Sequence, residues 1–225
     1  MHRDKPLLVG WNRSPYARRC AITMHIYGID FDQAHVNAWD AFDEVRAANP
    51  ISKVPALVIE TGDVIIESAA ILDYLDCRIG PDRSLTPPPG PLRDRCRRIT
   101  AVAQALIDKG RELRYEVHLR PPETRYEPFV ERWTGQLTDA LGALDRMLGT
   151  PFAAGERLTQ ADITAGVLVT MYRINFPTLI EDGRYPALEA LAARTHAMPA
   201  FQAAALEDMT GVASKATPRA DAKGI

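Results

Sequence analysis

The stretch that decides the fold runs from Asn49 to Leu75, NPISKVPALVIETGDVIIESAAILDYL. It places Val54-Pro55 at the start of an apolar strand, follows it with a second apolar strand, and then opens a helix with Glu67-Ser68. Because proline donates no backbone N–H, the strand entrance cannot pair normally, which leaves the peptide groups of Val54 for an extended ligand. Glu67, Ser68 and the helix start can offer a carboxylate, a hydroxyl and free N–H groups to the other end of that ligand, and the N–H groups suit a carboxylate there. The stretch therefore predicts a site for a small peptide.

Strand and helix patterns alternate on both sides of this site. Apolar and β-branched runs predict strands at 7–11, 31–36, 56–60 and 64–66. Helical patterns predict helices at 15–27, 40–48 and 67–78. Gly28 is placed to end the first helix, and Thr61-Gly62-Asp63 is a hairpin turn signal. The order βαβαββα is typical of a small mixed sheet with helices on its faces, so residues 1–80 are predicted to form an α/β domain.

The composition changes at residues 81–91, where Pro87, Pro88, Pro89 and Gly90 are typical of a linker. No strand pattern follows, so residues 92–213 are predicted to form an all-α bundle. The expected helices are 92–119, 127–148, 159–176, 185–198 and 199–209.

Local signals mark some boundaries of this second domain. Pro121-Pro122 separates the first of these helices from the second. Thr159 and Asp162 form a helix start in which the carboxylate returns a hydrogen bond to the N-cap residue, and a structural role is favoured for Asp162 over a catalytic one. The small, polar tail 214–225 is predicted to be disordered.

The composition argues against several classes of protein. The 225 residues are 46% hydrophobic, enough to bury an ordinary core. A net charge of −2 gives no general attraction to nucleic acid or an anionic membrane, and the densest basic run, Arg93 to Arg98, is interpreted as a solvated helix face. No segment approaches the roughly 20 apolar residues that span a bilayer, and no signal peptide is recognised. Cys20, Cys77 and Cys96 have no metal-ligand spacing and fit a reducing compartment, so a cytoplasmic protein without a metal is predicted.

The residues after the first strand, SPYARRC from Ser14 to Cys20, can carry chemistry. Ser14 suits the N-cap of the first helix and Pro15 its first position, and that structural role alone explains both. A hydroxyl at a helix N-terminus can also donate a hydrogen bond to a bound thiolate, which the positive helix end favours over the thiol. The two roles are compatible. Because position 14 is not cysteine, dithiol exchange is excluded there, and Cys20 is interpreted as a small core residue.

Several motifs occur along the chain in the order that is typical of one known protein family. They are SPYARRC, NPISKVPALV, ESAAILDYL, the proline-rich linker, LTQADITAG and YPALEALAARTHAMPAFQAA, and they extend over nearly the whole chain. In these motifs the chain resembles the cytosolic glutathione S-transferases. The resemblance implies a thioredoxin-like first domain, a helical second domain, a homodimer, a cis Pro55 and glutathione as the co-substrate.

The resemblance also assigns roles to individual residues. Val54 would pair its backbone with the cysteinyl part of glutathione, and Lys53 would reach the glycyl carboxylate. Glu67 and Ser68 would hold the γ-glutamyl end. Ser14 would lie nearest the sulfur, as in serine-type classes, with Asn12 and Tyr16 as alternative donors.

The second substrate is expected between the two domains. Its wall is predicted to come from Trp11, Tyr16 and the first long helix of the second domain. On that helix Gln104, Asp108, Arg111 and Tyr115 share one face, which can contact an electrophile or can equally be a solvated or dimer-facing surface. Tyr172, on a later helix, is interpreted as core packing.

Three functions remain open at this point. The leading one is a transferase that conjugates glutathione to a small hydrophobic electrophile. The second uses the same thiolate for isomerisation, dehalogenation, ether cleavage or peroxide reduction. The third is a non-catalytic ligand-binding protein on the same fold.

Overall fold

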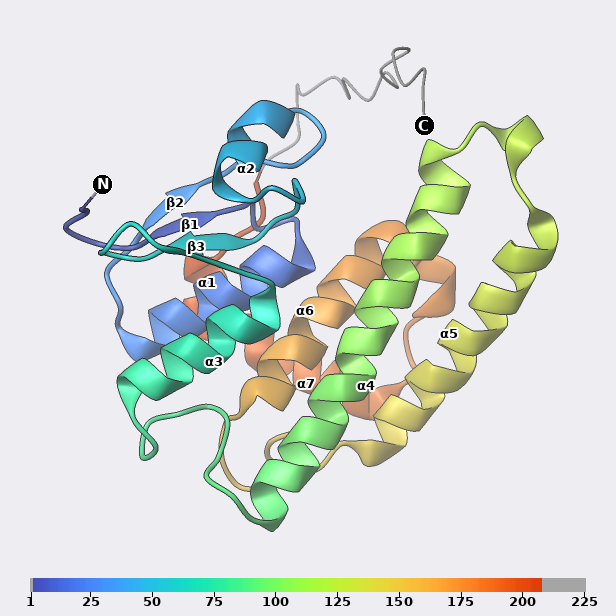
Figure 1. Cartoon of the computed structure of the whole chain (residues 1–225). Coiled ribbons are helices and arrows are strands. Elements are labelled where there is room, and N and C mark those ends of the chain that lie inside the picture. The colour runs from blue at the N-terminus through green and yellow to red at the C-terminus, as the bar shows by residue number, and fades with distance from the viewer. Residues whose placement is uncertain (1, 208–225) are drawn as a thin grey trace.

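The structure is a computed structural model that describes residues 2–207, with the N-terminal domain on one side and long helices on the other (Figure 1). The predicted disordered tail, 214–225, lies outside the described residues. The α/β domain followed by a helical domain confirms the predicted fold class. No helix among residues 2–207 is both long and apolar enough to cross a bilayer.

The N-terminal domain is built in the predicted order βαβαββα. Its elements are β1 (Leu7–Val9), α1 (Pro15–Tyr27), β2 (Asp32–Ala34), α2 (Phe42–Ala48), β3 (Ala56–Val58), β4 (Val64–Ile66) and α3 (Ser68–Ile79). The sheet order is β2-β1-β3-β4; β2 runs parallel to β1, whereas β3 is antiparallel to both β1 and β4. Helices α1 and α3 cover one face of the sheet, and α2 lies on the other side (Figure 1).

Helix α1 has the boundaries that its local signals predict. The Ser14 Oγ accepts the Ala17 N–H at 3.4 Å, Pro15 is the first helical residue, and Gly28 ends the helix with a φ of 68°. A left-handed conformation of this kind is the one glycine adopts without a steric cost. Capping therefore fixes where Ser14 lies, at the end of the helix that points into the cleft described below.

Helix α2 begins two residues later than the predicted 40–48. The side-chain oxygen of Asn37 accepts the backbone N–H groups of Trp39 (2.9 Å) and Asp40 (3.0 Å). This local turn competes with the helix for the same backbone groups, so regular helix starts only at Phe42. Strands β1, β2 and β3 are likewise shorter than predicted.

The helical domain contains α4 (Pro91–Arg114), α5 (Glu127–Met147), α6 (Gln160–Asn175), α7 (Pro186–His196) and α8 (Pro199–Ala203). The short helical turns η1 (Tyr115–Leu119), η2 (Pro122–Thr124) and η3 (Pro177–Leu179) lie between them. The predicted helix 92–119 does not stay α-helical to its end, because the Arg120 N–H donates to the Tyr115 carbonyl, five residues back, and makes η1 a π-helical turn. The predicted helix 199–209 ends at Ala203, residues 204–207 are not helical, and 208–209 lie outside the described residues.

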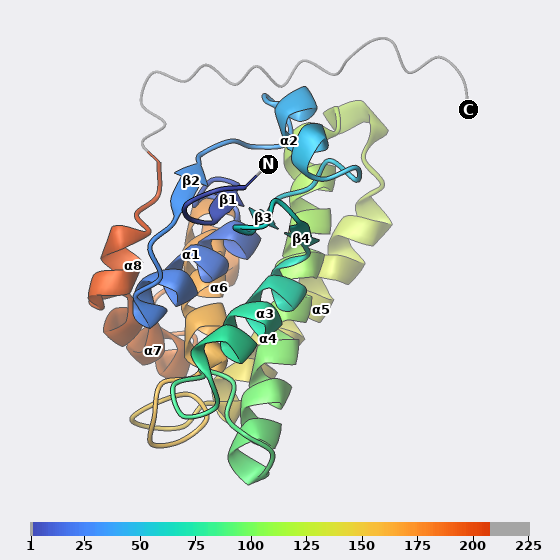
Figure 2. The ribbon, with the colours of Figure 1, turned by 60° about the vertical axis from the view of Figure 1, so that its left-hand side comes forward.

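The two domains share one of the two apolar cores. That core joins the sheet, α1 and α3 to Ile163 and Val167 of α6 and to Phe201 of α8. Figure 2 shows α8 beside α1, at the opposite side of the molecule from α5. The second core holds α4 to α7 together and buries Tyr172, whose hydroxyl donates to the Leu106 carbonyl at 2.9 Å.

The start of α6 is fixed by one buried carboxylate. Asp162 accepts hydrogen bonds from the backbone N–H of Ala153 (2.7 Å), the backbone N–H of Thr159 (2.9 Å) and the Thr159 hydroxyl (3.0 Å). With three local partners in the interior, Asp162 has a structural role here, as its place in the sequence indicates.

Candidate functional site

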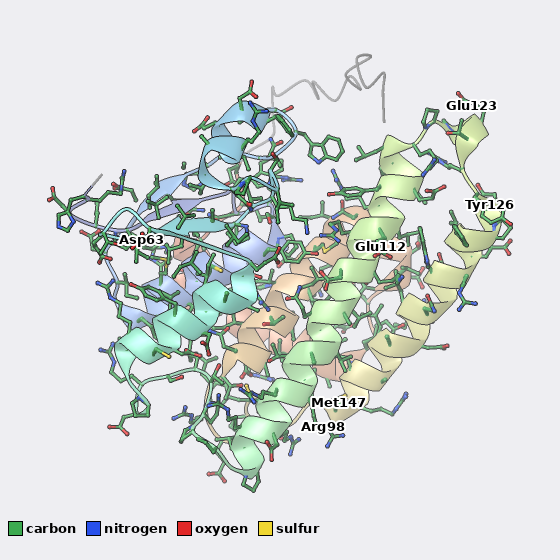
Figure 3. The ribbon with its side chains drawn as sticks, in the orientation of Figure 1. Asp63, Arg98, Glu112, Glu123, Tyr126 and Met147 are labelled. Atoms are coloured by element: carbon green, nitrogen blue, oxygen red, sulfur yellow. The ribbon has the colours of Figure 1, made fainter. Side chains whose placement is uncertain are left out.

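A cleft of about 1000 Å³ lies between the two domains. Its walls come from the β1–α1 loop, the segment before α2, the turn before β3, the start of α3, and one side of α4 and α6. Figure 3 places Glu112, one of its lining residues, on α4 at the level of the sheet, whereas Asp63 and Tyr126 lie at opposite ends of the molecule. All the residues singled out from the sequence for glutathione or the second substrate line this one cleft: Trp11, Ser14, Tyr16, Lys53, Val54, Pro55, Glu67, Ser68, Gln104, Asp108, Arg111 and Tyr115.

The Val54–Pro55 turn brings a free backbone edge to the cleft. The peptide bond is cis, as the family resemblance implies. Gly10 lies directly behind it: a Cβ at Gly10 would be 2.9 Å from the Ala17 Cβ and 3.1 Å from the Val54 Cβ. The side chain of Asn49 holds the turn by donating to the Lys53 carbonyl at 2.8 Å. The turn is thus packed closely against the start of α1, the helix that carries Ser14 at its N-cap.

The start of α3 offers hydrogen-bond donors to the same cleft. Within residues 2–207 no side chain caps this helix, so its first N–H groups remain for a ligand. Glu67 precedes it with a φ of 67°, a conformation that is uncommon for a residue with a side chain. The Glu67 carboxylate lies 3.8 Å from the Lys53 ammonium, and both side chains are more than half exposed. An ion pair so exposed contributes little stability and leaves both charges available.

A buried guanidinium lies behind Ser68. Arg19, on α1, is 2% exposed, and its Nε donates to the Ser68 Oγ at 3.1 Å. Its Nη1 is buried and has no hydrogen-bond partner among the described residues. Sequence reasoning missed Arg19, because nothing in the run Arg18-Arg19 distinguishes a solvated arginine from one that faces another helix.

Ser14 is free of strong competing bonds. It is 8% exposed, and its Oγ accepts the long capping bond from Ala17 while the hydroxyl hydrogen remains to be donated. The two alternative donors are engaged elsewhere.

Asn12 donates from Nδ2 to the Ala205 carbonyl (2.9 Å) and accepts at Oδ1 from Gln33 (3.0 Å). The Tyr16 hydroxyl donates to Asp108 at 2.7 Å. Burial, followed by this hydrogen bond, raises the pKa of Tyr16 far above its ordinary value. Tyr16 is therefore a neutral phenol whose proton is donated to Asp108, whereas the Ser14 hydroxyl donates to no group within residues 2–207.

The outer part of the cleft is polar on one wall and aromatic at its mouth. Asp108 also accepts from Gln104 at 3.2 Å, and the Arg111 guanidinium lies 5.7 Å from the centre of the Tyr16 ring. The polar face of α4 thus faces the cleft. Tyr115 meets Trp39 edge to face, with ring centres 5.7 Å apart. Trp39 and Phe42, both exposed and both lining the cleft, were missed from the sequence because they belong to an irregular loop and to the start of a short helix.

The segment after α8 is attached to the β1–α1 loop. The Glu207 carboxylate accepts the backbone N–H groups of Asn12 (2.7 Å) and Arg13 (3.1 Å) and lies 2.7 Å from the His35 Nδ1. Burial raises the pKa of Glu207, but the hydrogen bonds from Asn12, His35 and Arg13 outweigh it and hold the pKa below its ordinary value. These contacts fix the loop immediately before Ser14.

Two further observations concern the cysteine and acidic side chains of the described residues. Burial raises the pKa of the Cys20 thiol to about 12, so that thiol is unreactive. Residues 2–207 contain no group of three or more His, Cys, Asp or Glu side chains placed to hold a metal ion. What the cleft offers is a free backbone edge, a helix start with a buried cation, and a serine hydroxyl.

Two family models match the chain. The glutathione S-transferase N-terminal domain matches residues 8–83, and the glutathione S-transferase C-terminal domain matches residues 127–194.

Individual proteins are similar over different lengths. The uncharacterized GST-like protein YibF of Escherichia coli is 34% identical over 104 residues, which cover 46% of this chain and only half of that protein. A maleylacetoacetate isomerase of Pseudomonas aeruginosa is 28% identical over 165 residues, covering 69% of this chain and 76% of that one. A glutathione S-transferase of Methylobacterium radiotolerans, solved in complex with glutathione sulfonate, superposes with a TM-score of 0.82 at 28% identity, covering 90% of this chain and 95% of that one.

Proposed function

The chain belongs to the glutathione S-transferase family, and on that premise we propose that it binds glutathione in the cleft, ionises its thiol and conjugates it to a small hydrophobic electrophile. The observation that carries the proposal is that Ser14, Val54 and Ser68, which are far apart in the sequence, line one cleft with their polar groups available. A backbone edge, a helix start and a hydroxyl are the three kinds of group that a tripeptide with a central thiol would use.

Each part of glutathione has a proposed partner. The backbone of Val54 pairs with the cysteinyl residue, in a short form of strand addition. Lys53 reaches the glycyl carboxylate. Glu67, Ser68 and the first N–H groups of α3 hold the γ-glutamyl end, which carries both an ammonium and a carboxylate.

Ser14 is proposed to stabilise the thiolate. Lowering the pKa of a thiol by about two units requires about 2.7 kcal/mol. One charge-assisted hydrogen bond from Ser14, together with the positive N-terminal end of α1, is of about that size. The thiolate then attacks an electrophilic carbon of a substrate held in the outer cleft, and the leaving group departs with the bonding electron pair.

The outer cleft supports an apolar, flat electrophile. Trp11, Trp39, Phe42 and Tyr115 line it together with Met171 and Ile174. Such a surface binds by burial of apolar area, while Arg111 can orient a polar substituent.

A second candidate is a glutathione-dependent isomerase. The observation that favours it is the 28% identity to a maleylacetoacetate isomerase over most of both chains. Here the thiolate would add to the substrate and leave again after bond rotation, so that glutathione is not consumed. Dehalogenation, ether cleavage, peroxide reduction and a purely ligand-binding role remain alternatives on the same fold.

The proposal also covers the oligomeric state of the protein and its cellular compartment. We expect a homodimer, as the family resemblance implies, and sedimentation measures its mass directly. The three cysteines are free, in keeping with a reducing cytoplasm.

Two measurements test the proposed function. Titration calorimetry should detect glutathione binding at millimolar concentration or below, and its absence would refute the proposal. Replacing Ser14 with Ala should lower turnover of a model aryl halide by about 10- to 100-fold, the loss of one hydrogen bond to a charge, with a smaller change in glutathione affinity. Equal losses in affinity and turnover would assign Ser14 to capping alone. Measuring the glutathione concentration during turnover separates the two activities, because a transferase consumes glutathione and an isomerase does not.

A further inference from the structure

Two arginines of α4 line the outer cleft without an acidic partner. Arg111 and Arg114, here called the arginine pair, lie one helical turn apart, and both are half-buried. No salt bridge joins either side chain to an acidic residue within residues 2–207. Two like charges at this spacing on a helix repel each other, and partial burial reduces the screening by water. A bound anion would relieve that repulsion.

The acidic side chains that line the outer cleft already have other partners. Asp108 accepts hydrogen bonds of 2.7 and 3.2 Å from two other side chains of the cleft. Glu112 forms a salt bridge of 2.7 Å with Lys109. Asp40 accepts a hydrogen bond of 2.7 Å from the Asn37 side chain. The anion that the arginine pair lacks would therefore come from a ligand.

The Arg114 side chain is held in place from α6. Its Nε donates to the Asn175 Oδ1 at 2.9 Å, and the Asn175 Nδ2 in turn donates to the Met171 carbonyl at 2.8 Å. The two terminal nitrogens of Arg114 donate to no group within residues 2–207. A guanidinium that is fixed at Nε presents its terminal N–H groups in one direction, which lowers the entropy cost of binding an anion.

Arg111 lies close to the helix end that carries Ser14. Its guanidinium is 5.7 Å from the centre of the Tyr16 ring, and Tyr16 is the second residue of the helix that Ser14 caps. Next to the arginine pair, Tyr115 meets Trp39 edge to face, with ring centres 5.7 Å apart. The cleft thus offers a substrate both aromatic surface and two positive charges near the proposed thiolate donor.

We propose that Arg111 and Arg114 are specificity-determining residues that bind a carboxylate on the electrophilic substrate. The forked N–H groups of a guanidinium match the two oxygens of a carboxylate. The substrate class is then an aromatic or unsaturated carboxylic acid, whose flat apolar body contacts Trp39 and Tyr115. The inference rests on the proposed function, and it adds one negative charge to the electrophile that is proposed there.

Calorimetry with two glutathione conjugates tests the role of this charge. The probes are S-(4-carboxybenzyl)glutathione and S-(4-carbamoylbenzyl)glutathione, which have nearly the same shape and differ by one negative charge. The wild-type protein should bind the carboxylate roughly 10- to 100-fold more tightly than the amide, the effect of hydrogen bonds to a charged group. In the double variant Arg111→Gln/Arg114→Gln this ratio should fall to within about threefold.

Turnover gives a second readout of the same preference. In 4-chloro-3-nitrobenzoate and 4-chloro-3-nitrobenzamide the thiolate bonds to the carbon that carries chlorine, and chloride leaves with the bonding electron pair. Each kcat/KM is divided by the rate constant of the uncatalysed reaction with glutathione at the same pH, so that the intrinsic reactivities cancel. The wild-type protein should favour the benzoate, and the double variant should lose that advantage.

Arg98→Gln is the matched control for the single variant Arg111→Gln. Arg98 is exposed on the same helix, about 20 Å from Arg111 along the helix axis, and lies outside the cleft lining (Figure 3). Each variant removes one positive charge from α4. Arg98→Gln should leave both ratios unchanged, whereas Arg111→Gln should lower them. An equal fall in the two variants would assign the preference to the overall charge of the protein and would overturn the inference.

The outcomes separate the inference from the proposed function. If the wild-type protein does not bind glutathione, both are overturned. If it binds glutathione but binds the two conjugates equally, or if the double variant keeps the wild-type ratio, the inference alone is wrong. If the conjugates show the expected ratios and neither aryl chloride is turned over, the carboxylate site stands and the proposed transferase activity is wrong. Should the double variant fail to fold, the single variants take its place, and the conjugate ratio has to fall in each.

Discussion

Asn12, Ser14 and Tyr16 lie near the proposed position of the sulfur. They differ in whether their hydrogen-bond donors already have an acceptor in the protein. The Asn12 amide is bound to Ala205 and Gln33, and the Tyr16 hydroxyl is bound to Asp108. Of the three, only Ser14 has a donor hydrogen that no other group within residues 2–207 accepts. The motif SPY alone could not make this distinction, because the partner of Tyr16 lies 92 residues away in the chain.

This difference predicts the behaviour of Tyr16→Phe. The thiol of bound glutathione should keep its pKa to within about 0.3 units, because the Tyr16 proton is donated to Asp108 and not to the sulfur. The pH profile of kcat/KM with an aryl halide measures this thiol pKa. Ser14→Ala is the comparison, and in that variant the apparent pKa should rise by about one to two units. An equal upward shift in Tyr16→Phe would make Tyr16 the thiolate donor.

At the scale of elements, the loop between β1 and α1 is fixed from two directions. The Val54–Pro55 turn packs against Gly10, the first residue of the loop, and Glu207 binds the backbone of Asn12 and Arg13 further along it. The loop carries Ser14, so its geometry depends on residues more than 190 positions later in the chain.

The carboxylate of Glu207 should make this attachment sensitive to acid. Its pKa in the folded protein lies below the ordinary value, so it stabilises the fold above the ordinary pKa of a glutamate, about 4.3, and that stabilisation is lost as the pH falls through the folded value. Glu207→Gln should lower the free energy of unfolding by about 1 to 2 kcal/mol at pH 7. Below about pH 4.5 the free energy of unfolding should fall less steeply in this variant than in the wild-type protein.

Urea titrations at several pH values measure the effect of Glu207→Gln. Glu123→Gln is the matched control, since Glu123 is exposed on η2 at the far end of the molecule (Figure 3). Identical pH dependence in the two variants would show that Glu207 is not an anchor. A loss of turnover confined to Glu207→Gln would link the anchor to Ser14.

The elements that could be predicted are those whose ends are decided locally. Ser14, Pro15 and Gly28 set the bounds of α1 within the chain itself, and Thr61 to Asp63 set the hairpin. The start of α2 was misplaced because Asn37 captures two backbone N–H groups, a competition that propensity does not reveal. The π-helical turn after α4 also has no periodic signal.

On the scale of the whole molecule, the domains are joined by a common core. Phe201 of α8 is 2% exposed and packs with Ile163, Val167 and the apolar face of α1. Two domains with a shared core of this kind should unfold together.

Phe201→Ala tests that coupling. The cavity should lower the unfolding free energy by about 3 to 5 kcal/mol, and calorimetry should still show a single transition at a lower temperature. Phe129→Ala, at a site that is 49% exposed on α5, should change stability far less. Two separated transitions in the wild-type protein would contradict a shared core.

The location of the candidate site was predictable where its lining residues lie in one segment. Val54, Pro55, Glu67 and Ser68 lie within one short stretch, so their common place in the cleft lining could be predicted together. Arg19 and Trp39 reach the cleft beside residues from distant segments: Arg19 on α1 donates to Ser68 on α3, and Trp39 meets Tyr115 of the helical domain. No local pattern in the sequence marks either residue.

The burial of the thiols has a practical consequence. Cys20 and Cys96 are enclosed in the two cores, whereas Cys77 is exposed on α3, the helix whose start holds the γ-glutamyl end in the proposed complex. A maleimide fluorophore should therefore attach at one position without any engineered cysteine. Dye emission from that position would give an optical readout of occupancy, and the stoichiometry of labelling would count folded molecules in a preparation.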